Sequence, residues 1–153
     1  MLEKLFVYAL LLRVDLMAMD EYNRYLDEMF LQDPDNDLLL ELEYCSKDSA
    51  RSIELITTSC QQEMDFNFAN FGKRLTEKLE GIYHQNHLDL NSFGDKVYHL
   101  WQILPSNMQM DEPFGILCYA NDPLSYGDEK QSRALYQDFF RYDKKQAVMK
   151  KVR

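Results

Sequence analysis

The chain has 153 residues, the size of one domain, and 46% of them are hydrophobic, which excludes disorder as its default state. Its 22 Leu outnumber five Val, five Ile and three Thr, and it has only five Gly and four Pro. This composition favours helices and excludes a many-stranded sandwich or barrel. We therefore expect an all-α protein, an irregular, partly orthogonal bundle of six or seven helices that forms a single domain over residues 1–143.

The charge is strongly negative and unevenly distributed. The net charge is −9, with 12 acidic and four basic residues in 1–48 and one acidic and six basic residues in 141–153. A negative surface argues against nucleic acid as a partner, because binding to phosphates needs Lys and Arg. It suits a basic protein partner, although net charge also serves solubility alone. The basic tail over 144–153 is expected to fray or to dock on the acidic body.

Cysteines and the first apolar run indicate the compartment. Cys45, Cys60 and Cys118 are odd in number and form no C-x-x-C pair, which favours free thiols in a reducing cytoplasm. The apolar run over 5–12 is too short to cross a membrane, and no good cleavage site follows it. We interpret this run as a helix that is apolar on all sides and buried in the centre of the bundle.

Helical spacing of apolar residues continues through the first half of the chain. A second helix is predicted to be capped by Asp20 and to end at Pro34, which cannot continue the hydrogen bonding. A short helix over 38–44 and a longer one after Asp48 should follow. The inner face of the longer helix is expected to comprise Ala50, Ile53, Ile56 and Cys60.

Two further apolar stripes with a short linker over 84–90 predict an antiparallel helical hairpin. The stripes are Phe68, Phe71, Leu75, Leu79 and Ile82, then Phe93, Val97, Leu100, Trp101 and Leu104. Residues 113–127 fit either a short helix or an extended segment. A last helix should begin near Asp128 and turn Leu135, Phe139 and Tyr142 inward.

Two segments contain residues that can bind metals. His84 and His87 lie three residues apart, with carboxylates nearby, and two such imidazoles can share a metal ion. Histidines at a helix C-terminus also interact favourably with its dipole, and the sequence offers no third ligand. The acidic run over 33–37 starts like a calcium loop but lacks the required Gly and the bidentate Glu. We therefore predict no metal or cofactor and interpret the acidic run as a turn.

The candidate partner-binding residues are Trp101, Tyr119, Asp122 and Tyr126. Aromatic side chains with polar groups, set among turn residues, are typical of recognition surfaces. The alternative is that these rings close one end of the bundle and that their hydroxyls bind backbone groups.

No sequence motif for nucleophilic catalysis or phosphate binding is present. We therefore expect a non-enzymatic cytoplasmic protein that binds a partner through an acidic helical surface; an immunity- or antitoxin-like role would need no more than this. The alternative is a metal-dependent hydrolase that uses His84, His87 and nearby carboxylates. A third hypothesis is a small-ligand pocket lined by Trp101 and Tyr119. The sequence does not indicate an oligomeric state.

Overall fold

The computed structural model describes residues 2–63, 65–85 and 89–152, the last ten of them by their backbone alone. Within these ranges the chain forms eight α-helices, seven of them with eight or more residues, two 3-10 helices and no strand, so the predicted all-α fold is confirmed. Contacts divide the chain into two units, Met1–Leu75 and Thr76–Arg153, and the boundary falls inside one helix. The single domain over 1–143 remains a prediction.

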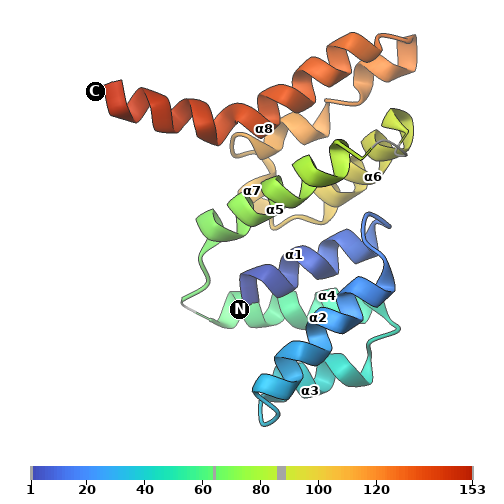
Figure 1. Ribbon diagram of the computed structural model, residues 1–153, viewed down its shortest axis with the longest axis vertical. Helices are drawn as coiled ribbons and strands as arrows, with labels where there is room; N and C mark the ends of the chain where they lie inside the picture. Colours follow the sequence, from blue (N-terminus) through green and yellow to red (C-terminus); the bar gives the residue numbers. More distant parts are fainter. Residues whose placement is uncertain (1, 64, 86–88, 153) are drawn as a thin grey trace. The chain divides into compact units, whose positions relative to one another are not determined.

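The first unit consists of four complete helices and the first half of a fifth (Figure 1). They are α1 (Leu2–Arg13), α2 (Met19–Gln32), α3 (Asp37–Tyr44), α4 (Ser49–Gln62) and α5 (Phe68–Tyr83). Helix α4 contacts α1 and α3, and α2 contacts the same two helices. The four helices thus pack as a ring of neighbours, in which α1 supplies most of the apolar surface.

Helix α1 is buried on nearly every side. Its buried residues are Leu2, Leu5, Phe6, Val7, Ala9, Leu10, Leu11 and Leu12. The ring of Phe6 stacks on that of Phe71 in α5, with centroids 4.8 Å apart. A helix that is apolar all round needs neighbours all round, so the predicted buried helix is confirmed as the core of the first unit.

Two predictions in this unit are wrong, one about the residue that caps α2 and one about the buried face of α4. Helix α2 is preceded by Ala18, which has no side-chain oxygen to cap it, and Asp20 lies in the first turn instead. On α4, Ala50 is exposed and Ser52 is buried. The Ser52 hydroxyl lies 3.0 Å from the carbonyl oxygen of Asp48 and donates to it, so its burial leaves no polar group unsatisfied.

The second unit continues from α5 through α6 (Leu90–Ile103), α7 (Ser106–Gln109), η1 (Phe114–Cys118), η2 (Asp122–Tyr126) and α8 (Glu129–Val152). The two 3-10 helices answer the open question over 113–127. Helix η1 contacts α6, α7 and α8, and η2 contacts α8. Gly127, with φ of 80°, ends η2 in a left-handed conformation that favours glycine.

The end of α5 lies against the start of α6, as a hairpin requires: the Tyr83 and Phe93 rings have centroids 5.5 Å apart. Part of the predicted linker, 86–88, lies outside the described residues. The inner face of α8 differs from the predicted one. Its buried residues are Ser132, Tyr136, Phe139 and Phe140, whereas Leu135 and Tyr142 are half-buried. Three aromatic rings and a small polar residue, rather than leucine, form the buried side of α8 in its described part.

Candidate functional site

Trp101 links two neighbouring helices. Its indole Nε1 donates to the carbonyl oxygen of Gln109 at 2.8 Å, and Gln109 Nε2 donates back to the Trp101 carbonyl at 3.1 Å. The half-buried ring also stacks on Tyr98. Among the described residues no hydrogen bond or ring contact joins Trp101 to the 119–126 segment. The role of Trp101 in binding a partner remains a prediction.

The other three candidates share the η1–η2 segment. Tyr119 is 46% exposed and Tyr126 is 66% exposed, and Asp122 is also exposed. The Tyr126 hydroxyl contacts Gln131 Oε1 at 3.3 Å, next to the first turn of α8. These side chains are accessible to a partner, but their role in binding one remains a prediction.

The residues considered as metal ligands are not gathered into a site within the described part of the chain. His84 is exposed beside the Tyr83 ring, and His87 lies outside the described residues. The residues that the structure describes contain no group of three or more His, Cys, Asp or Glu side chains placed to hold a metal ion. In the acidic turn, Asn36 Oδ1 accepts from the Leu39 amide at 3.2 Å and so caps α3.

Eight of the exposed acidic residues of the first unit lie on α2, α3 and the turn between them. They are Asp20, Glu21, Asp27, Glu28, Asp33, Asp35, Asp37 and Glu41. Only one basic residue, Arg24, lies within 19–44. This surface has a negative potential that attracts basic groups and repels phosphates.

One face of α3 combines these charges with exposed apolar groups. Leu40 is 41% exposed and Tyr44 is 86% exposed, and Asp37 and Glu41 lie on the same side of the helix. The four residues follow i, i+3, i+4, i+7 spacing, which places them in one stripe; we call this stripe the α3 face. The opposite side of α3 contains Leu39 and Leu42, which are fully buried.

Sequence reasoning did not identify the α3 face, although its spacing was visible. The segment 38–42 contains four leucines that point all round the helix, so the pattern does not tell which side is buried. Packing against α2 and α4 decides this, because those helices cover Leu39 and Leu42 and leave Leu40 exposed.

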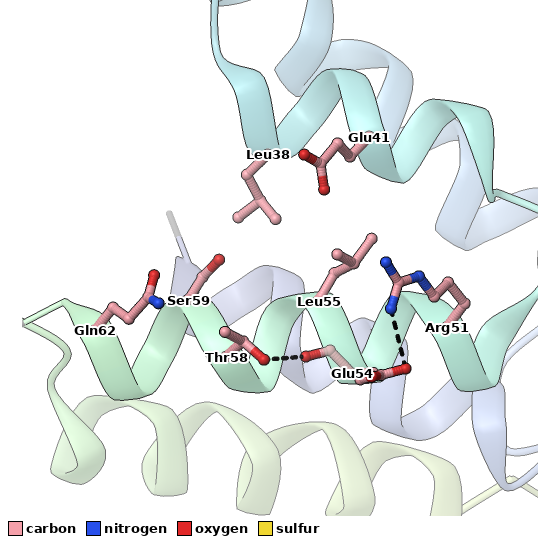
Figure 2. A pocket seen from close by; sticks show the side chains of 8 residues that line it. All are labelled: Leu38, Glu41, Arg51, Glu54, Leu55, Thr58, Ser59 and Gln62. Atoms are coloured by element: carbon pink, nitrogen blue, oxygen red, sulfur yellow. Dashed lines mark hydrogen bonds and ion pairs between the residues drawn. The ribbon is translucent and has the colours of Figure 1, made fainter.

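A groove with a volume of about 390 Å³ runs beside the α3 face, between α3 and α4 (Figure 2). We call it the α3–α4 groove; it is lined by Leu38, Glu41, Arg51, Glu54, Leu55, Thr58, Ser59 and Gln62. Leu38 and Leu55 reach toward each other from the two helices. Arg51 lies 3.1 Å from the Glu54 carboxylate, and Thr58 Oγ1 donates to the Glu54 carbonyl oxygen at 2.9 Å.

A carboxyl pair joins α2 to α3 on the other flank. The pKa of Glu43 is raised to about 7, first by burial and then by a hydrogen bond to the Asp27 carboxyl and by the charge of that group. Glu43 Oε1 is fully buried and finds no donor among the described residues. Two carboxyl groups this close share a proton more readily than they both ionise.

No helix in the described part of the chain has the length and apolar character needed to cross a bilayer. No protein-family description, curated protein or solved structure matches this chain.

Proposed function

We propose that the protein is a non-enzymatic, cytoplasmic binding module whose acidic helical surface on the first unit binds a basic protein. The observation that carries this proposal is the α3 face, where Leu40 and Tyr44 are exposed in one stripe with the carboxylates of Asp37 and Glu41. Tyr119, Asp122 and Tyr126, with Trp101, remain a second proposed contact region. An immunity- or antitoxin-like role is compatible with this chemistry.

The α3 face offers a partner two kinds of group, an exposed tyrosine and carboxylates. A tyrosine that is 86% exposed can bury a large ring and still hydrogen-bond through its hydroxyl, a combination enriched among residues that dominate binding energy. The carboxylates around it steer a basic partner and speed its association, an effect that salt screens. Nucleic acid is disfavoured because its phosphates carry the same sign of charge.

The test is affinity capture from native extract at low and at high salt with four baits: wild type, Tyr44→Ser, Glu41→Lys and Glu77→Lys. Glu77 is an exposed helical glutamate in the second unit and provides the matched charge reversal. We expect a basic protein on the wild-type and Glu77→Lys baits that is lost at high salt. The Tyr44→Ser and Glu41→Lys baits should retain little of it.

Two results would overturn this proposal. One is a partner held equally by all four baits, which would place binding away from the α3 face. The other is a complex that does not weaken with salt, since a contact built on exposed carboxylates must be screened. Each variant is first compared with wild type by circular dichroism, and the exposed positions chosen should leave the helix content unchanged.

A further inference from the structure

The α3–α4 groove has the chemistry of a receptor for one long basic side chain. Leu38 and Leu55 extend into it from the two helices, and the other lining residues supply carboxylates, hydroxyls and an amide (Figure 2). A side chain that fits has an apolar stem and a cationic end, which describes arginine and lysine. Its volume of about 390 Å³ lies at the lower end of the range for small-ligand sites, roughly 300–1,000 Å³.

The charges lining the groove do not balance. Glu41 and Glu54 face one cationic residue, Arg51, which is paired with Glu54 at 3.1 Å. The Glu41 carboxylate has no hydrogen bond or ion pair within the described part of the chain, and it lies on the α3 side of the groove (Figure 2). One negative charge on the rim is therefore left without a counter-charge from the protein.

Arg51 provides an example of a guanidinium beside a carboxylate of this groove. It pairs with Glu54, three residues along the same helix, at 3.1 Å. Beyond the carboxylates, Ser59 and Gln62 add oxygen acceptors at one end of the groove. A guanidinium has five donors in a fixed plane and suits several acceptors better than the single point charge of an ammonium group.

Glu41 connects the groove to the proposed interface. It belongs to the α3 face and also lines the groove, so a partner segment lying over Leu40 and Tyr44 passes the mouth of the groove. We propose that the α3–α4 groove binds an arginine side chain of the basic partner, with its stem between Leu38 and Leu55 and its guanidinium on Glu41. This inference rests on the proposed function and specifies what the partner must present.

The experiment titrates the isotope-labelled full chain with N-acetyl-arginine amide and follows amide chemical shifts by NMR. The neutral isostere N-acetyl-citrulline amide and N-acetyl-lysine amide are titrated in parallel. We expect saturable shifts at Leu38, Leu55 and Ser59 with the arginine probe, in the millimolar range. The citrulline probe should cause no saturable change, and the lysine probe should bind more weakly.

Three variants distinguish specific binding of the arginine probe in the groove from its non-specific attraction to the acidic surface. Glu41→Gln should weaken the arginine probe about two- to fivefold, the range that an exposed ion pair supports. Arg51→Gln should strengthen it by a similar factor, because it frees Glu54 for the incoming guanidinium. Glu77→Gln, which removes the same charge in the second unit, should leave the affinity unchanged.

Several outcomes would overturn the inference. Two of them are a citrulline probe or a lysine probe that binds as tightly as the arginine probe. The others are chemical-shift changes spread over all the acidic helices, and an Arg51→Gln variant that binds the arginine probe more weakly than wild type. If the probe fails while partner capture still depends on Tyr44, the groove inference is wrong and the proposed function stands. If the probe binds but no partner depends on Tyr44, the proposed function fails instead.

Discussion

Tyr136 is almost completely buried in the second unit, with its ring packed against Phe93 at a centroid distance of 5.2 Å. Its hydroxyl has no hydrogen-bond partner among the described residues, and burial raises the pKa of the phenol. A buried hydroxyl left without a partner costs about 1–3 kcal/mol. The ring stabilises the fold, whereas its polar atom does not.

We therefore expect Tyr136→Phe to leave the free energy of unfolding unchanged or to raise it by up to about 1 kcal/mol. Urea unfolding followed by circular dichroism measures this difference. A loss of more than about 1 kcal/mol would mean that the hydroxyl makes a hydrogen bond in solution.

Gly94 and Gly81 form a matched pair of helical glycines with opposite surroundings. A Cβ at Gly94 would lie 2.9 Å from the Cβ of Asn121, an atom attached directly to the backbone, whereas a Cβ at Gly81 meets nothing within 4 Å. Gly94→Ala should therefore destabilise the protein by about 1–3 kcal/mol through overpacking. Gly81→Ala should stabilise it by about 0.5–1 kcal/mol, because alanine is the better helix former.

Thermal unfolding of the two variants checks this prediction. The melting temperature should fall for Gly94→Ala and rise for Gly81→Ala, relative to wild type. A neutral Gly94→Ala would show that Asn121 moves away at little cost. In that case α6 and the segment between η1 and η2 are not packed closely enough to require glycine.

At the scale of elements, the contact between α2 and α3 includes the carboxyl pair of Asp27 and Glu43. The pKa of Glu43 is raised from its ordinary 4.5 to about 7, first by burial and then by Asp27. The folded state thus holds a proton that the unfolded chain releases between these two pH values. This contribution to stability is complete below about pH 4.5 and is lost as the pH rises through about 7.

Glu43→Gln should flatten this pH dependence, because the glutamine amide donates to Asp27 at every pH. We expect wild type to lose on the order of 1 kcal/mol more than the variant between about pH 5 and pH 8. Urea midpoints at several pH values measure the difference. Glu41→Gln, at an exposed position of the same helix, is the control and should keep the wild-type profile; a parallel profile for Glu43→Gln would contradict the prediction.

At the scale of the whole molecule, the two units share the uninterrupted helix α5. It supplies Phe71 and Leu75 to the first unit and Leu79 to the second, and all three side chains are fully buried. If either unit unfolded, the half of α5 that packs in it would lose its tertiary contacts. We therefore expect one cooperative unfolding transition, as the single domain predicted from the sequence requires.

The only tryptophan, Trp101, makes this testable because its fluorescence reports on the second unit. Leu26 is fully buried in the first unit, so Leu26→Ala should cost about 2–5 kcal/mol there. We expect this variant to shift the Trp101 transition as far as it shifts the far-ultraviolet circular dichroism signal. If the Trp101 transition keeps its wild-type midpoint, the two units unfold independently.

Prediction from sequence succeeded where one local rule decides the outcome. Pro34 follows the end of α2, Asp48 accepts from the Arg51 amide in the first turn of α4, and the run over 5–12 is buried in α1. Helix phase was predicted less well. Ser52 replaces Ala50 on the inner face of α4, because hydrogen bonds to neighbouring carbonyls satisfy its hydroxyl, and no apolar pattern reveals such partners.

The sequence by itself determined the all-α class, the positions of most helix ends and the negative charge of the first unit, because these depend on composition and on neighbours within one helical turn. The tertiary structure decided which leucine of α3 stays exposed, and it decided that Glu41 and Arg51 line one groove. It also decided that the Trp101 indole donates to the Gln109 carbonyl oxygen. These outcomes depend on which helices cover which faces, and that information is spread over the whole chain.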